Sequence, residues 1–170
     1  YGTEKPMYKV EVRYTSYVDI SDFANSKNLE DIDIYRNSAK ARRQEIRYAI
    51  RDEIRTEECF EPDIFTELYR QTFSRQDKEV GEEKLSEMNA LIKIMQNSGS
   101  IRMYASNVDD DKIASMVCYG LDNKRAYYLF GANDSSLRDS HAGTAVLWDS
   151  FKMLSEFGIR TVDLEGVNSP

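Results

Sequence analysis

The last third of the chain carries the order of elements that most limits the fold: two strands, a helix and a further strand. Residues 113–121 and 125–131 both have strand character, and the short polar link between them predicts a hairpin. Apolar residues at helical spacing predict a helix over residues 142–157, and a last strand is predicted over residues 159–165. The sequence therefore predicts an α/β fold in which this helix packs across a sheet.

A third strand precedes the hairpin. Residues 101–107 alternate between apolar and polar side chains, as a half-buried strand does. An Asp-rich turn over residues 108–112 then leads into the hairpin. Because three successive strands in hairpin order pair antiparallel, we expect a mostly antiparallel sheet over residues 101–131, extended by the strand at 159–165.

The middle of the chain predicts three helices. One runs from Ser38 to about Glu53, one begins at Pro62, and one ends before Asn97-Ser-Gly99. The second and third carry an apolar stripe, which is typical of scaffold helices that bury one face.

The first of these helices has a basic surface. Lys40, Arg43, Arg47 and Arg51 recur on adjacent turns, whereas Arg42 belongs to the face that also carries Ile46 and Ala49. The basic residues either pair with nearby acidic residues on a solvated surface, or they grip a phosphate or carboxylate.

Composition indicates one domain. The 170 residues, of which 41% are hydrophobic, can bury one core. No apolar run approaches the roughly 20 residues of a membrane helix, so we expect no membrane span. The net charge of −7 disfavours DNA as a partner, because nucleic-acid binding needs a basic surface. Cys59 and Cys118 lie far apart without metal-ligand spacing, which predicts reduced thiols in a cytoplasmic protein and no metal site.

Several motifs follow one another in an order that one family shares. A strand ends at Gly120, the aromatic strand Tyr127-Tyr-Leu-Phe-Gly-Ala132 comes next, a helix ends at Phe157-Gly158, and Asp163-Leu-Glu-Gly-Val-Asn168 lies near the end. This order resembles the GNAT acyltransferase fold. The helix Lys40-Ala-Arg-Arg-Gln-Glu-Ile-Arg-Tyr-Ala49 before a helical pair makes the FemAB-like branch the most similar form.

The resemblance covers almost the whole chain and implies a GNAT-like, mostly antiparallel sheet flanked by helices. Residues 1–37 are interpreted as an extended segment from a preceding module, and residues 38–170 as the acyltransferase domain. Within the first segment, residues 8–20 alternate as a strand does, and residues 21–37 predict a polar loop with a short helical turn. The family's closing strand is not found in the sequence, so we expect part of a two-module protein.

The resemblance implies a site for the acyl donor between the aromatic strand and the helix after it. In the family, a thioester arm hydrogen-bonds to exposed strand edges, and its pyrophosphate rests on amide groups at the start of that helix. The matching residues are Ser140, His141, Ala142, Gly143, Thr144 and Ala145. Gly143 and Ala145 fit positions where a small residue lets the backbone approach a phosphate.

Ser140 departs from the family pattern, which usually has Arg or Gln at this position. The departure weakens the case for acyl-CoA as the donor and leaves aminoacyl-tRNA, which peptidoglycan-bridge members use, as an alternative. An ordinary helix start, with Ser140 or Thr144 as the N-cap, explains the same residues equally well.

The acceptor chemistry limits the choice of catalytic residues. An amine loses a proton as it attacks an acyl carbon, so the site needs a base and often an acid for the leaving thiolate. Asp163 and Glu165, two apart on the last strand and so expected on one face, are the candidates for holding and deprotonating the amine; the alternative is that they are structural and bond to nearby arginines or to a backbone turn. Tyr128 is the candidate proton donor. His141, the single histidine, either contacts phosphate, acts in catalysis or is structural.

The function predicted from the sequence is transfer of an acyl or aminoacyl group to an amine of a sugar, a cell-envelope glycan or a peptide. The alternative is a binding module that keeps the fold and has lost the chemistry, with a nucleotide or acyl ligand. The oligomeric state is left open.

Overall fold

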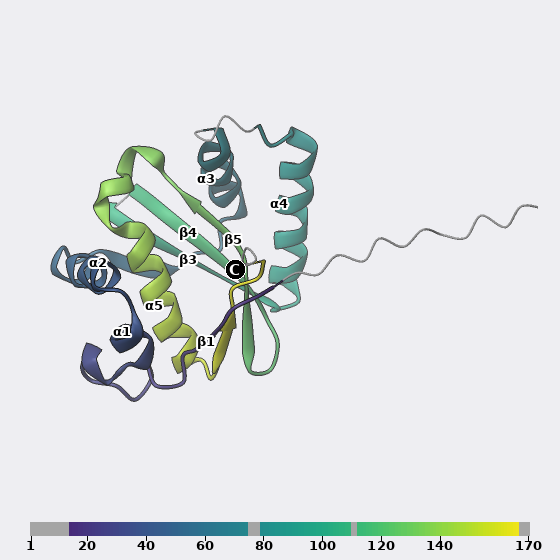
Figure 1. The fold of residues 1–170 in the computed structure, drawn as a ribbon. Coiled ribbons are helices and arrows are strands. Elements are labelled where there is room, and N and C mark those ends of the chain that lie inside the picture. The colour runs from purple at the N-terminus through teal and green to yellow at the C-terminus, as the bar shows by residue number, and fades with distance from the viewer. Residues whose placement is uncertain (1–13, 75–78, 110–111, 167–170) are drawn as a thin grey trace, which may run out of the picture.

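The computed structural model describes residues 14–74, 79–109 and 112–166, and a six-stranded sheet lies at its centre (Figure 1). The strands are β1 (Tyr17–Asp19), β2 (Arg55–Glu58), β3 (Ile101–Asp109), β4 (Lys112–Leu121), β5 (Arg125–Asn133) and β6 (Thr161–Asp163). Their order across the sheet is β1-β6-β5-β4-β3-β2. All neighbouring strands are antiparallel except β5 and β6, which are parallel. The predicted α/β fold with a mostly antiparallel sheet is confirmed.

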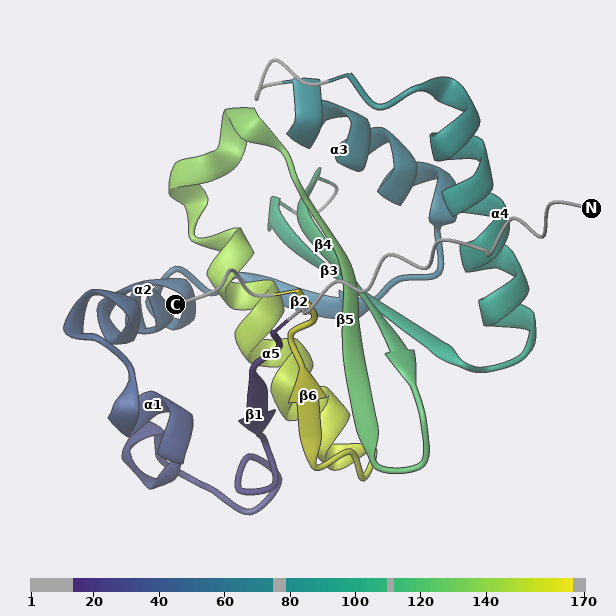
Figure 2. The same ribbon diagram turned by 45° about the vertical axis from the view of Figure 1, so that its right-hand side comes forward.

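Helices cover both faces of the sheet (Figure 2). They are α1 (Asp33–Asn37), α2 (Lys40–Arg51), α3 (Pro62–Ser74), α4 (Glu82–Asn97) and α5 (Ala142–Glu156), with 3₁₀ turns η1 (Leu29–Asp31) and η2 (Ser135–Ser140). The helices α3 and α4 pack on one face, and α5 crosses the other with α1 and α2 beside it.

The two faces follow from the alternation of side chains along the strands. On β4, Met116 and Cys118 join the core under α3 and α4, whereas Val117 and Tyr119 join the core under α5. The hydroxyl of Tyr119 lies 2.9 Å from that of Ser150 on α5, so the polar end of this buried ring is hydrogen-bonded. The sheet thus has a hydrophobic core on each side.

β5 and β6 stay together only at one end. The pairs are Arg125 with Thr161, Ala126 with Val162, and Tyr127 with Asp163, after which β6 ends while β5 continues to Asn133. β5 also carries a bulge, because its register with β4 skips Leu129. A bulge increases the local twist and bend of a strand. Beyond Tyr127, β5 has no strand partner on this side among the described residues, and this opening between β5 and β6 is called the gap below.

Three details differ from the sequence-based prediction. The strand predicted over residues 159–165 is limited to β6, because Glu165 has a left-handed backbone with a φ of 44° and so cannot continue an extended strand. β2 has no apolar alternation that would mark it, since it is a polar edge strand. The short α1 lies in the segment predicted as a loop, 21–37.

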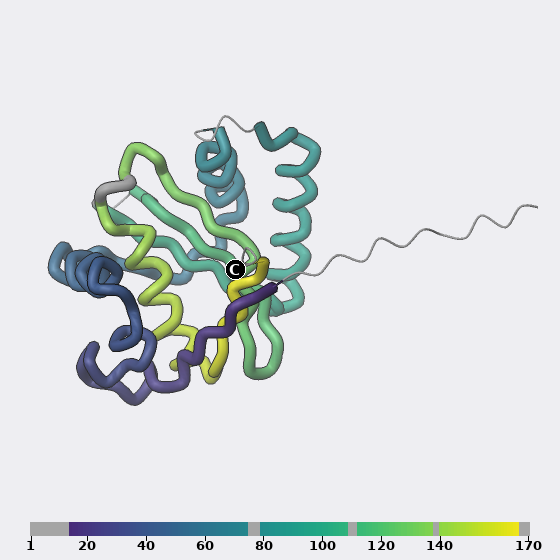
Figure 3. Tube along the Cα trace, in the orientation of Figure 1, coloured from purple at the N-terminus to yellow at the C-terminus, as the bar shows by residue number. Residues whose placement is uncertain are grey.

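The beginning of the described chain joins the sheet beside its end. β1 pairs antiparallel with β6, and Figure 3 shows the two segments side by side. Of the strand predicted over residues 8–20, residues 8–13 lie outside the described residues, and only β1 has strand structure.

We predict that Leu154→Ala lowers the free energy of unfolding by about 2–5 kcal/mol, because it opens a cavity between α5 and the sheet. Leu154 is 0% exposed. Leu91→Ala on α4 is the matched control, since Leu91 is 45% exposed and its loss is expected to cost about 0.5 kcal/mol or less. Urea denaturation of both variants measures the difference, and equal costs would contradict this account of the core.

Candidate acyl-donor and acceptor site

The first turn of α5 touches the far end of β5. A Cβ atom placed on Gly143 would lie 3.1 Å from Oδ1 of Asn133, the last residue of β5. Asn133 is itself held by Thr72 of α3, whose hydroxyl oxygen accepts from the Asn133 amide at 2.9 Å. Gly143 is therefore small for a packing reason as well as for the predicted approach to a phosphate. The start of α5 therefore lies against the end of β5.

The residues that join η2 to α5 form a tight corner. His141 has a left-handed backbone with a φ of 61° and no side-chain cap bond to the helix. The Ser140 hydroxyl donates to the Leu137 carbonyl at 2.5 Å and lies 3.4 Å from the Ala142 amide nitrogen, which it caps weakly. Backbone strain of this kind at a non-glycine residue is often found at ligand-binding sites.

The other residues predicted to bind the acyl donor are either buried in the core or in contact with α2. Ala142 and Ala145 are buried. The hydroxyl of Thr144 donates to the Glu45 carboxylate at 3.1 Å, and the Arg42 guanidinium reaches the same hydroxyl at 3.5 Å while also pairing with Glu45. Thr144 is thus tied to α2 instead of capping its own helix.

Arg42, Glu45 and Tyr48 of α2 are the site residues that the sequence analysis missed. The Tyr48 ring lies 5.2 Å from the His141 ring, centroid to centroid, so three successive turns of α2 line the start of α5. The available signal was the place of Arg42 one turn before Ile46, on the side of the predicted helix that packs against the rest of the chain; its own side chain is 61% exposed.

The basic residues predicted to form a surface on this helix mainly make hydrogen bonds and ion pairs with nearby residues. Arg43 donates to the carbonyls of Arg36 and Ser38, at 2.9 and 2.8 Å. Arg47 donates to the Tyr35 hydroxyl at 3.0 Å, and Arg51 pairs with Asp52 at 2.7 Å. These contacts favour the structural interpretation of the basic surface.

Tyr128 lies at the point where β5 and β6 separate. Its position on β5 directly follows Tyr127, the last residue paired with β6. The side chain packs against Tyr119 at 5.8 Å between ring centroids, and its hydroxyl lies over Gly131, where any Cβ would collide with it. Burial raises the pKa of Tyr128, with a smaller contribution from Tyr69. A phenol with an ordinary or raised pKa carries its proton at neutral pH, as a proton donor must.

The two carboxylates do not share a strand face. Asp163 is only 4% exposed, and its Oδ1 accepts hydrogen bonds from the Thr15 hydroxyl and, at 3.0 Å, from the Glu165 amide. Glu165 follows the end of β6 and is exposed. The expected pair is thus one buried anchor and one solvated carboxylate, because the strand ends between them.

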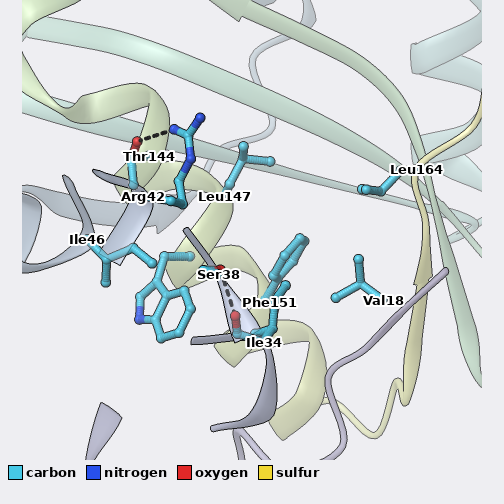
Figure 4. Close-up of a pocket in the computed structure, with 10 residues that line it drawn as sticks. Val18, Ile34, Ser38, Arg42, Ile46, Thr144, Leu147, Phe151 and Leu164 are labelled. Carbon is cyan, nitrogen blue, oxygen red and sulfur yellow. Dashed lines mark hydrogen bonds between the residues drawn. The ribbon is translucent and has the colours of Figure 1, made fainter. Parts of the chain in front are cut away.

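A pocket of about 350 Å³ runs along α5 beside this region (Figure 4). Its walls come from β1, α1, α2, α5 and the residue after β6. The residues that line it are Val18, Ile34, Ser38, Arg42, Ile46, Thr144, Leu147, Trp148, Phe151 and Leu164.

A family model described as an acetyltransferase (GNAT) domain matches residues 34–170. The chain belongs to the GNAT acetyltransferase family. A search of curated proteins finds no match. Among the described residues, no helix is long and apolar enough to cross a membrane, and no three His, Cys, Asp or Glu side chains are grouped to hold a metal ion.

Solved structures of GNAT proteins and of FemX share this fold. FemX has a TM-score of 0.73 at 14% sequence identity, and the match covers 99% of this chain and 57% of FemX. The C-terminal DUF2156 domain of a lysylphosphatidylglycerol synthetase candidate from Agrobacterium fabrum has a TM-score of 0.62 at 12% identity, covering 93% of this chain and 48% of the other.

A predicted acetyltransferase with acetyl-CoA from Clostridium acetobutylicum has a TM-score of 0.52 at 8% identity. The match covers 64% of this chain and 78% of the other. At identities this low, all three likenesses are of fold alone. The chain spans about half the length of the first two of these proteins.

We predict that Asp163→Ala lowers the free energy of unfolding by about 1–3 kcal/mol, because it leaves the Thr15 hydroxyl and the Glu165 amide without their acceptor. Asp163→Asn keeps an oxygen in the same place and is expected to cost less. Glu165→Ala is the exposed control, with a change of about 0.5 kcal/mol or less. Thermal and urea unfolding test the order, and a stable Asp163→Ala variant would contradict the anchoring role.

Proposed function

We propose that this GNAT domain transfers an acyl group from acyl-CoA to a primary amine. The observation that carries the proposal is the gap between β5 and β6, which opens beside the first turn of α5 in a chain of this family. A thioester lying in the gap would place its pyrophosphate at the start of the helix, where the positive end of the helix dipole favours anions.

The donor would be held by backbone groups more than by side chains. Beyond Tyr127, the edge of β5 that faces the gap has no strand partner among the described residues. Its N–H and C=O groups can pair with the amide groups of a thioester arm, as an added strand would. The same N–H groups can stabilise the oxyanion that forms when an amine attacks the thioester carbonyl.

The proton transfers that the reaction needs suggest roles for the three candidate catalytic residues. Glu165 is exposed and can take a proton from the attacking ammonium group, directly or through water. Tyr128, whose pKa is raised by burial, can give its phenol proton to the leaving thiolate. Asp163 acts through Glu165, since it fixes the Glu165 amide, and is a positioning residue.

Acyl-CoA is preferred as the donor because one of the similar solved structures contains acetyl-CoA. The resemblance of the sequence motifs to the FemAB-like branch favours an amine on a glycan or a peptide as the acceptor, with a role in the cell envelope. The comparisons offer no support for aminoacyl-tRNA. A domain that binds its ligand without turnover is the alternative, and activity measurements separate it from the enzyme.

We predict that coenzyme A raises the melting temperature of the wild type, since a ligand at 100 times its Kd adds about 2.7 kcal/mol of stability. Gly143→Asp should lose this gain because it brings a negative charge to the phosphate position. Gly143→Ala is the matched control, because its Cβ meets Asn133 in the same way without the charge. An equal rise in melting temperature in the wild type and Gly143→Asp would show that coenzyme A binds elsewhere.

We predict that Glu165→Gln and Tyr128→Phe each lower kcat by about 10²–10⁴-fold, the usual contribution of a general base or acid. Both variants should melt close to the wild type, because Glu165 is exposed and the ring of Tyr128 is retained. A thiol-release assay with a panel of amines measures turnover. Unchanged kcat in both would exclude them from the chemistry, and binding of coenzyme A without turnover of any amine would favour the binding module.

A further inference from the structure

The interior of the pocket along α5 is almost wholly apolar. Its two hydroxyl groups already donate hydrogen bonds: the Ser38 hydroxyl donates to the Ile34 carbonyl at 2.6 Å, and the Thr144 hydroxyl donates to Glu45. Arg42 pairs with Glu45 at one end. What remains exposed to the pocket is hydrocarbon and aromatic surface, chiefly from Val18, Ile46, Leu147, Phe151 and Leu164.

One end of the pocket lies at the first turn of α5, and the other lies beside the end of β6. Arg42 and Thr144 stand at the first turn of α5, where phosphates would bind, and Val18 and Leu164 stand at the opposite end (Figure 4). Leu164 directly follows Asp163, the last residue of β6 that pairs with β5. The apolar interior therefore begins beside the gap that would hold the thioester.

We propose that this pocket holds the acyl chain of the donor, and that the chain is a medium-length aliphatic or aromatic acyl group. The inference rests on the proposed function and specifies its donor. An aminoacyl group would bring an ammonium into the pocket and a nucleobase would bring polar edges, and both would lose water to a lining that is mainly apolar. An apolar acyl chain loses no hydrogen bond on entry.

Trp148 makes the proposal directly measurable, because it lines the pocket and is the only tryptophan in the sequence. We expect octanoyl-CoA to shift the emission of Trp148 to shorter wavelength and to bind at least about tenfold more tightly than acetyl-CoA. Each additional buried methylene is worth about fourfold in affinity. Octanoate alone, without the nucleotide, should give the same shift at higher concentration.

Substitutions that fill the pocket test whether the acyl chain binds there. Ile34→Phe adds bulk to the wall formed by α1, and Val18→Phe does the same from β1, so that one remains if the other fails to fold. Either should reduce the affinity for octanoyl-CoA to that for acetyl-CoA and leave acetyl-CoA binding unchanged. Ile64→Phe on α3 is the matched control, because Ile64 is 41% exposed and lies outside the pocket.

The outcomes separate this inference from the proposed function. Equal affinity for acetyl-CoA and octanoyl-CoA, unaffected by Ile34→Phe, overturns the acyl pocket and leaves coenzyme A as the donor. Loss of all three ligands, coenzyme A included, in Ile34→Phe shows that the pocket holds another part of the donor and also overturns it. A Trp148 shift with octanoate but no binding of any CoA species supports an apolar-chain site and overturns the proposed donor. No response to any ligand overturns both.

Discussion

The hydrogen bonds between β5 and β6 stop at Tyr127 and Asp163, although β5 continues to Asn133. Backbone N–H and C=O groups away from water need partners, so a strand edge left open in this way must bind solvent or a ligand. The bulge at Leu129 bends β5 on one side of the gap, and the left-handed backbone at Glu165 ends β6 on the other. The proposed phosphate position, Tyr128 and one end of the apolar pocket lie around this separation.

The start of α5 is electrostatically balanced by α2. The positive end of a helix dipole favours a nearby anion, and Glu45 supplies a carboxylate there through its bond with Thr144. Arg42 lies against the same pair. A phosphate arriving at this turn would meet one charge that repels it and one that attracts it. The α2 helix therefore influences how strongly the site holds an anion, in addition to forming one wall of the pocket.

Most of the secondary structure could be predicted because the signals were local. The hairpin of β4 and β5, the helix α5 and the apolar stripes of α3 and α4 all follow from side-chain spacing. The short strands were harder to predict. β2 is a polar edge strand, and the left-handed backbone of Glu165 keeps β6 from continuing toward the C-terminus. No local pattern distinguishes a strand of three residues from one of seven.

The candidate site has local and tertiary parts. The order of the motifs put residues 140–145 at the start of a helix, which is where α5 begins, and Tyr128 lies where β5 and β6 separate; their roles stay predictions. The different surroundings of Asp163 and Glu165 depend on Thr15, which is distant in the sequence. The contact of Arg42 and Tyr48 with the start of α5 is likewise tertiary, so spacing within the helix could not reveal it.

The pairing of β1 with β6 has a consequence for how the domain folds. β6 lies between β1 and β5, so it joins a strand from the beginning of the described chain to one from its last third. Contacts between residues so far apart along the chain form slowly, because a long loop must close before they contribute. During synthesis, β3, β4 and β5 can assemble early, whereas β1 must wait for β6 to emerge from the ribosome. The donor gap is therefore among the last parts of the domain to form, and nascent chains expose the unpaired edge of β5 until then.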